Sequence, residues 1–183
     1  MGGNYMSVGL ALREARQVKK ISQQALGSMG FCSGKLISAI EREERQPSFD
    51  IMGKLTYELD DPRLYMEVAE EVTGGVFSVP WLNGDCVDLH RSSVKEKVEE
   101  ELNEAIESIR LTRICNNPKT CKSDQRRLIR KSILETIDVL VACTTYIAIM
   151  CREYEFSVRE LFKEHRNKLV ERGYLKNMKG CNL

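Results

Sequence analysis

The sequence lacks three features that would narrow its function at once: a large net charge, a secretory signal and internal repeats. Its 28 Lys and Arg residues are balanced by 27 Asp and Glu residues, which gives a formal net charge of +1. Charge alone therefore does not indicate a nucleic-acid-binding protein, so that function has to be argued from local features. The N-terminus has no basic stretch followed by a long apolar run, and no segment is of low complexity.

The cysteines indicate the cellular compartment. The chain has seven, an odd number, and no signal precedes them. Free thiols in the cytoplasm are the natural interpretation. Cys115 and Cys121 bracket a short loop, but no second Cys or His pair accompanies them, so a zinc site is not expected. We therefore predict a cytoplasmic protein with reduced cysteines.

Strand-type alternation is also missing, and the apolar residues follow helical spacing throughout. Hydrophobic residues make up 42% of the 183 residues and charged residues 30%, which is typical of a globular chain. The most apolar stretch, residues 133–151, contains Glu135 and Asp138, which a bilayer would disfavour. It is interpreted as a core helix, not a membrane span. The predicted fold class is all-α.

The first part of the chain is predicted to contain five short helices. Their expected ranges are 8–19, 23–29, 34–42, 49–59 and 62–73. Ser22, Ser33 and Ser48 stand where they can cap the second, third and fourth helices. Two consecutive glycines, Gly74 and Gly75, end the fifth. We therefore expect a first domain over residues 1–73.

The rest of the chain is predicted to be a connecting arm and a second helical domain. Residues 74–90 carry turn signals and form the arm. Residues 91–183 form the second domain, with three longer helices. Ser93 with Glu96, and Ser157 with Glu160, are capping boxes that we expect to open the first and third of these. The first is expected to run to about residue 115, the second to follow Ser123 and run to about residue 153, and the third to end near residue 173.

Three short segments carry a resemblance to a known family. They read ISQQAL at 21–26, LISAIER at 36–42 and RQPS at 45–48. In this order and spacing they resemble the Xre/lambda-repressor helix-turn-helix regulators, over about residues 8–59. Leu26, Cys32, Ile37 and Ile40 would pack the third helix across the second. The resemblance implies a five-helix lambda-repressor-like DNA-binding domain whose third helix enters the major groove of an operator.

The same resemblance implies which residues face DNA. Lys35 and Ser38 are the candidates for base edges, Gln23 for a phosphate, and Glu41 for a structural tie between helices. The full set of candidate DNA-binding residues is Gln23, Ser33, Lys35, Ser38, Ala39, Arg42 and Arg45. Because Gly34 has no side chain and Glu43 is acidic, we expect weak binding by one copy alone. No cofactor is required for this binding.

Two carboxylate pairs stand out in the second domain. Glu101 and Glu104 are three residues apart, and so are Glu135 and Asp138, so each pair shares a helix face. Carboxylates on an otherwise apolar face are costly unless they bind a cation. If the two helices face each other, the four carboxylates would make a site for a hard cation such as Mg²⁺.

These pairs resemble the E-x-x-E and E-x-x-D motifs of MazG-like nucleotide pyrophosphohydrolases, over about residues 85–175. The resemblance implies a MazG-like helical bundle that forms dimers or higher homo-oligomers. It also implies that Asn167, Lys168 and Arg172 contact nucleotide phosphates. No catalytic residue is assigned firmly. An active site would use Mg²⁺ to help water split a nucleoside triphosphate into a monophosphate and pyrophosphate.

Three functions therefore stay open. The first is a sequence-specific transcriptional regulator that binds double-stranded DNA, pairs through its second domain, and senses a nucleotide there. The second is a Mg²⁺-dependent nucleoside triphosphate pyrophosphohydrolase with an accessory DNA-binding domain. In the third, the second domain only oligomerises the chain or docks an antirepressor protein. The first is preferred, and none of the three involves a membrane.

Overall fold

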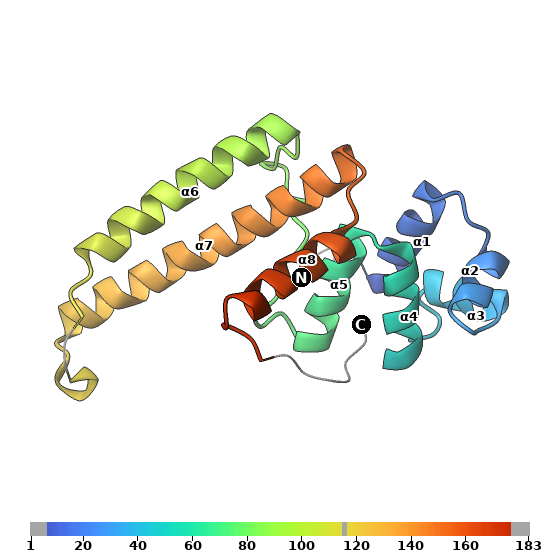
Figure 1. Ribbon diagram of the computed structural model, residues 1–183, viewed down its shortest axis with the longest axis horizontal. Coiled ribbons are helices and arrows are strands. Elements are labelled where there is room, and N and C mark those ends of the chain that lie inside the picture. Colours follow the sequence, from blue (N-terminus) through green and yellow to red (C-terminus); the bar gives the residue numbers. More distant parts are fainter. Residues whose placement is uncertain (1–6, 115–116, 177–183) are drawn as a thin grey trace. The chain divides into compact units, whose positions relative to one another are not determined.

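All the regular secondary structure is helical in the residues that the computed structural model describes, 7–114 and 117–176, and these contain no strand. This confirms the predicted all-α class. The elements in chain order are α1 (Val8–Val18), α2 (Gln23–Met29), α3 (Gly34–Glu41), α4 (Phe49–Leu59), α5 (Pro62–Thr73), α6 (Arg91–Leu111), the short 3₁₀ helix η1 (Pro118–Thr120), α7 (Ser123–Glu153) and α8 (Val158–Glu171) (Figure 1). Cys115 lies outside the described residues.

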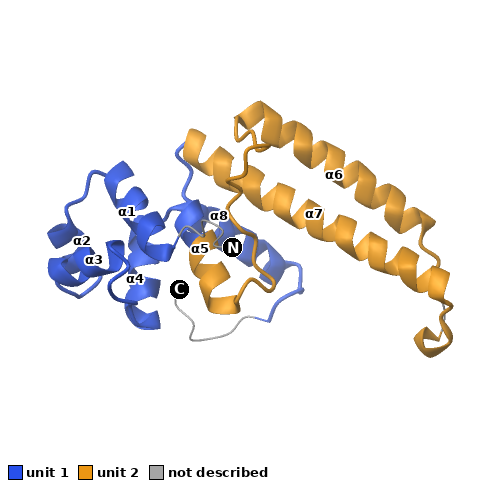
Figure 2. Ribbon diagram, turned by 180° about the vertical axis from the view of Figure 1, so that it is seen from behind, with its two compact units in different colours: residues 1–65, 154–183 blue, residues 66–153 orange. Residues whose placement is uncertain are grey.

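The helices divide into two compact units (Figure 2). Residues 1–65 and 154–183 form one, and residues 66–153 form the other. Helix α8 therefore groups with the N-terminal helices, although it is last in the chain. The two units are defined by how compactly the chain packs, whereas the expected domains 1–73, 74–90 and 91–183 were defined by function. The expected domains therefore stay predictions.

Serine caps explain where the first three helices begin. The side-chain oxygens of Ser7, Ser22 and Ser33 accept hydrogen bonds from the backbone N–H three residues further on, at 3.4, 3.1 and 3.2 Å. Each bond satisfies one of the N–H groups that a helix start leaves without a partner. Ser48 stands at the cap position of α4, but its side chain makes no capping bond.

The first unit has a small apolar core, drawn from four of its short helices. Leu26, Ile37 and Ile40, which were predicted to pack α3 across α2, are fully buried or nearly so, whereas Cys32 is half-buried. Leu12 from α1 and Leu55 from α4 are also fully buried. Burying such a side chain contributes roughly 1.5–3 kcal/mol, so these few contacts fix the arrangement of α1 to α4.

Asp60 attaches α8 to the first unit. Asp60 ends α4 in the left-handed conformation, with φ of 42°. Its two carboxylate oxygens accept hydrogen bonds from the Ser157 hydroxyl, at 2.5 Å, and from the Arg159 backbone N–H, at 3.0 Å. The Arg159 guanidinium also stacks over the Tyr57 ring, 4.1 Å from its centroid. A negative charge at the start of a helix is favourable, so Asp60 acts as a cap supplied from another helix.

The second unit is built on an antiparallel hairpin of α6 and α7. Small side chains line the surface between them, including the buried Ala105 on α6 and Ala142 and Thr145 on α7. The connecting arm packs near the end of α7, where Val79 forms a buried cluster with Met66 and Ala148 and where Trp81 and Val141 pack against that cluster.

One predicted helix start is wrong. Helix α6 begins at Arg91 with His90 as its cap, three residues before the cap expected at Ser93. The Ser93 hydroxyl does not cap the helix; it donates a hydrogen bond to Asp88 at 2.6 Å. Asp88 also accepts from the His90 backbone N–H, and these two bonds lower the pKa of its carboxyl. The helix ends at Leu111, short of the expected residue 115. By contrast, the predicted cap at Ser157 is confirmed, since Ser157 accepts from the Glu160 N–H at 3.1 Å.

Candidate nucleic-acid interface and carboxylate cluster

Helices α2 and α3 approach each other so closely that two glycines are required. A Cβ atom on Gly27 would lie 2.8 Å from the Cys32 carbonyl oxygen and 2.9 Å from the Gly34 nitrogen. A Cβ atom on Gly34 would lie 3.0 Å from Cα of Gln24. The atoms that would be met are backbone atoms, which cannot move aside as a flexible side chain can. The start of α3 is thus held directly against the start of α2.

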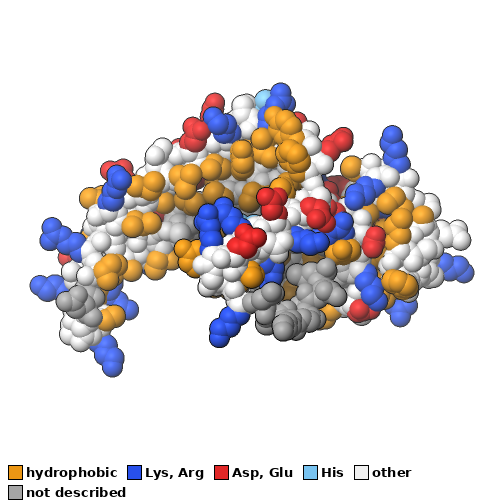
Figure 3. Space-filling view, viewed as in Figure 1, with side chains coloured by type: hydrophobic (Ala, Val, Ile, Leu, Met, Phe, Trp, Pro, Cys, Tyr) orange, Lys and Arg blue, Asp and Glu red, His pale blue; other side chains and the backbone are white. Residues whose placement is uncertain are grey.

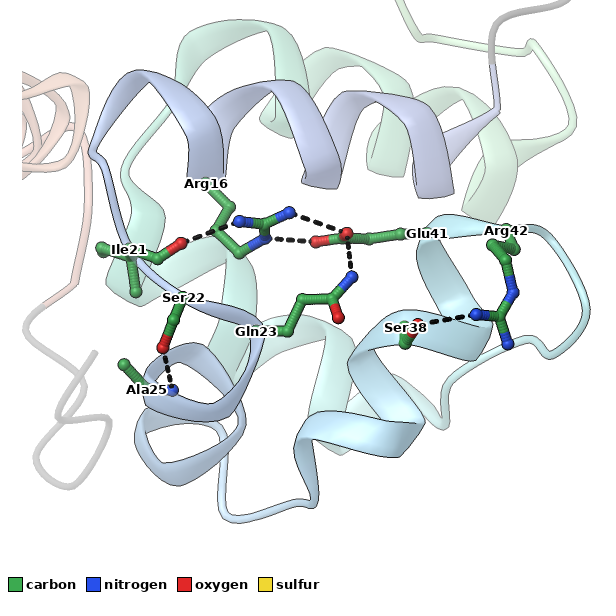
Figure 4. A network of polar contacts seen from close by, with 8 residues as sticks. All are labelled: Arg16, Ile21, Ser22, Gln23, Ala25, Ser38, Glu41 and Arg42. Carbon is green, nitrogen blue, oxygen red and sulfur yellow. Dashed lines mark hydrogen bonds and ion pairs between the residues drawn. The ribbon is translucent and has the colours of Figure 1, made fainter.

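A buried ion pair ties α3 to the rest of the unit (Figure 4). Glu41, at the end of α3, is 3% exposed and accepts hydrogen bonds from Arg16 Nε at 2.5 Å and Nη2 at 2.9 Å. The Gln23 side chain adds a third bond through Nε2 at 2.8 Å. This hydrogen bonding raises the pKa of Arg16. Glu41 therefore links α1, α2 and α3, as the structural role predicted for it requires.

The predicted DNA-binding residues of α3 lie on the side away from this core. Lys35 and Arg42 are exposed, and Ser38 and Ala39 are half-buried. Ile37, Ile40 and Glu41 form the buried side. Among the remaining candidates, Ser33 and Arg45 are exposed and Gln23 is half-buried.

Several of these side chains already have partners within the chain. Arg42 donates to both carboxylate oxygens of Glu44, each at 2.8 Å, and to the Ser38 hydroxyl at 2.8 Å. The bond to Glu44 raises the pKa of Arg42 and lowers that of Glu44. The Ser33 hydroxyl oxygen caps α3, and Gln23 Nε2 is used by Glu41. Their contacts to DNA stay predictions, and such contacts would compete with these internal bonds.

Three of the four predicted carboxylates converge in the hairpin. Glu101 on α6 and Glu135 and Asp138 on α7 each offer an oxygen atom, and these atoms lie within 4.8 Å of one another. Glu104 is exposed and does not belong to this group. The triad could hold a metal ion, because hard divalent cations take oxygen ligands of this kind.

Lysine side chains already compensate part of the negative charge of this triad. Lys97 Nζ lies 2.7 Å from Glu101 and 2.9 Å from Glu100, and these contacts raise the pKa of Lys97. Lys131 Nζ lies 3.8 Å from Glu135. A cation bound to the triad would replace these ammonium groups as the local positive charge.

The predicted phosphate-contacting residues belong to the other unit. Asn167, Lys168 and Arg172 are exposed, Asn167 and Lys168 on α8 and Arg172 immediately after it, and α8 groups with residues 1–65. The carboxylate triad is in the unit of residues 66–153. Neither unit by itself therefore contains both halves of the expected nucleotide site.

One residue and one partnership that shape the candidate interface were not identified from the sequence. Arg16 was not singled out, although an Arg on an otherwise apolar helix face, facing a Glu expected to be structural, is a usable signal. Glu44 was not expected to bind Arg42. The first partnership joins α1 to α3, and the second spans the turn after α3.

Comparisons with protein-family models, with curated proteins and with solved structures find no match to this chain.

Proposed function

We propose that this protein is a sequence-specific DNA-binding regulator and that α3 reads the DNA. The observation that carries this proposal is the two-sided nature of α3. One side is locked into the core through Ile37, Ile40 and Glu41, while Lys35 and Arg42 face solvent. A short helix held rigidly by one face, with basic side chains on the other, suits insertion into the major groove.

The helices around α3 support the same proposal. Five helices, α1 to α5, follow one another in the order and with nearly the lengths that the resemblance to lambda-repressor-like domains implies. The tight contact at Gly27 and Gly34 and the Glu41 network give α2 and α3 a fixed mutual geometry. Fixed geometry matters because base readout requires side chains held near their contact positions before binding.

One copy of this surface would bind DNA weakly. Lys35 is the only basic side chain within α3, and Arg42, at its end, is engaged by Glu44. Electrostatic contact with phosphates supplies much of the affinity of such proteins, and here it is modest. A homodimer would present two copies of α3 to a two-fold symmetric operator and add their contributions.

Selection of binding sites from random duplex DNA, using the full chain, tests the proposal. We expect one enriched, two-fold symmetric sequence. Lys35→Ala and Ser38→Ala should relax discrimination among sites, whereas Gln23→Ala should weaken binding evenly. Lys163→Ala is the matched control, because it removes an exposed lysine of α8 in the same unit. Absence of any enriched sequence would exclude sequence-specific DNA binding, and unchanged binding by all three variants would exclude α3 as the reader.

A second candidate function is favoured by the carboxylate triad: Mg²⁺-dependent hydrolysis of a nucleoside triphosphate. The oxygen donors of Glu101, Glu135 and Asp138 suit Mg²⁺, which would polarise phosphate oxygens and activate water. Pyrophosphate release from a panel of nucleoside triphosphates tests it. Activity that is lost in Asp138→Asn and kept in Glu104→Gln would support this function. No release with either Mg²⁺ or Mn²⁺ would exclude it.

A further inference from the structure

The α6–α7 hairpin leaves large apolar side chains uncovered along both helices. They recur at helical spacing, so that those on each helix share a face. The exposed residues are Leu102, Ile106 and Ile109 on α6, and Ile133, Ile137 and Leu140 on α7, each between 40% and 55% exposed. Figure 3 shows hydrophobic side chains gathered along both helices on one face of the hairpin. We call these six residues the apolar stripe.

A two-helix hairpin cannot cover such a stripe by itself. Helix α7 is long and apolar enough to cross a membrane by length and composition, yet only 22% of its most apolar window is buried. A bilayer is a poor cover, because Glu135 and Asp138 lie within that helix and α6, packed along it, carries many charges. Apolar surface of this extent on a helix pair is typical of a face that another helical layer covers.

The charges of the hairpin are segregated along its length. The tip, residues 110–114 and 117–131, contains eight Lys and Arg residues and one acidic residue. The first part of α6, residues 95–107, contains six Glu and two Lys residues. Figure 3 shows Lys and Arg side chains around the tip. The hairpin is therefore basic at its tip and acidic towards its base.

The helical spacing extends the apolar stripe into both charged regions. Arg126 and Arg130 precede Ile133 and Ile137 at intervals of three and four residues, so they lie on the same face of α7. Glu99 precedes Leu102 by three residues on α6. All three charged side chains are exposed. A partner that covers the stripe must therefore also meet a basic end and an acidic end.

We propose that two copies of this chain associate through the apolar stripe with their hairpins antiparallel, so that the basic tip of each lies beside the acidic base of the other. A second copy is self-complementary in this orientation. A parallel pair would place eight basic residues against eight more at the tips, which is unfavourable at short range. The product is a four-helix layer with a shared apolar core.

The dimensions of the hairpin allow this pairing. Helix α6 has 21 residues, which corresponds to a length of about 30 Å. The stripe occupies the C-terminal half of α6 and the middle of α7, with Ile106 and Ile137 near its centre. A two-fold axis through that centre brings Arg126 and Arg130 of one copy alongside Glu96 and Glu99 of the other. The apolar contact supplies the affinity, and the charges select the orientation.

This proposal rests on the proposed function only in the biological role of the dimer, which would position two copies of α3 on one operator. Its test needs no DNA, so the two can fail separately. Analytical ultracentrifugation of the full chain should give a dimer. Ile137→Glu with Leu140→Glu should raise the dissociation constant on the order of a hundredfold. The matched control is Phe77→Glu, because Phe77 is 98% exposed and lies off the stripe.

Charge reversal tests the orientation with exposed side chains, one of which, Glu99, already pairs with Lys95 at 3.0 Å. Arg126→Glu with Arg130→Glu should weaken the dimer, and so should Glu96→Lys with Glu99→Lys. The chain with all four changes should dimerise nearly as well as the original, because tip and base attract again. Added salt should weaken the original dimer, since its end contacts are attractive. Circular dichroism would verify that each variant stays helical.

Five outcomes would overturn the proposal. If the original chain is monomeric, the proposed dimer does not form. If the stripe variants dimerise as well as the original chain, the dimer interface lies outside the apolar stripe. Failure of the four-change chain to recover, or tighter association in salt, would contradict the antiparallel orientation. Flotation of the full chain with vesicles of phosphatidylcholine and phosphatidylglycerol, lost in Ile137→Glu with Leu140→Glu, would show that lipid covers the stripe instead.

Discussion

Arg16 and Glu41 form a two-point ion pair across 25 residues of sequence, with Nε to Oε1 at 2.5 Å and Nη2 to Oε2 at 2.9 Å. Arg16 also donates from Nη1 to the Ile21 carbonyl oxygen at 2.8 Å. The pair is nearly enclosed, since the Arg16 side chain is 13% exposed and that of Glu41 is 3% exposed. One arginine thus holds both the loop before α2 and the end of α3.

Removing Glu41 should destabilise the first unit strongly. Glu41→Ala leaves the Arg16 guanidinium buried without its main partner, and such a loss costs about 3 kcal/mol. Urea denaturation of the full chain, followed by circular dichroism, measures the change. Glu44→Ala is the matched control, because its ion pair with Arg42 is exposed. Equal effects of the two substitutions would contradict the structural role of Glu41.

The backbone contact at Gly27 predicts opposite effects for two glycine substitutions. Gly27→Ala places a methyl group within 2.9 Å of backbone atoms of the turn, so α2 and α3 must separate, at a cost of roughly 1–3 kcal/mol. Gly53→Ala, within α4, meets nothing within 4 Å and should stabilise the chain by roughly 0.5–1 kcal/mol. Thermal unfolding of both variants checks this. A harmless Gly27→Ala would mean that α2 and α3 are not packed backbone to backbone.

Helix boundaries were largely predictable because their signals are local. Ser22, Ser33 and Ser157 cap the helices that the sequence assigned to them, and each does so within three residues of its own position. Ser93 failed because His90 and Asp88, just before it, offer a competing set of hydrogen bonds. Local patterns predict that a helix starts nearby, whereas the hydrogen bonds of the neighbouring polar groups determine which residue caps it.

Partners distant in sequence were much less predictable. The grouping of α8 with residues 1–65 depends on Asp60, whose bonds to Ser157 and Arg159 span nearly a hundred residues. The convergence of Glu101 with Glu135 and Asp138 was expected from their spacing, but the exclusion of Glu104 depends on the rotation of α6 against α7. The spacing of residues along a helix shows which of them share a face of that helix. It does not show which part of that face contacts the neighbouring helix.

The junction between α4 and α5 should make stability depend on alkaline pH. Burial, together with the charge of Asp60 and a hydrogen bond to it, raises the pKa of Tyr65 to about 12, from an ordinary value of 10.0. The folded chain therefore favours the neutral phenol. This contribution is fully present below pH 10 and is lost as the pH rises towards 12. Since the ring is partly exposed, we expect a loss of about 1 kcal/mol.

Tyr65→Phe isolates this effect, because phenylalanine cannot ionise. Denaturation at several pH values between 9 and 12 should show a steeper loss of stability in the original chain than in the variant. Lysine and arginine ionisation affects both chains alike and cancels in the comparison. Parallel curves for the two chains would rule out the contact between Tyr65 and Asp60.

The exposed pair of Arg42 and Glu44 should limit DNA binding. Glu44 holds the Arg42 guanidinium through two hydrogen bonds at 2.8 Å and adds negative charge beside the expected phosphate backbone. Glu44→Ala should therefore raise affinity for duplex DNA several-fold, with little change in sequence preference, because phosphate contacts carry no sequence information. It should also steepen the dependence of log affinity on log salt by about one unit, as one more phosphate contact forms. Titration of labelled DNA at several salt concentrations measures both quantities, and the double variant Arg42→Ala with Glu44→Ala should lose the gain. An affinity unchanged in Glu44→Ala would mean that Arg42 does not face the DNA.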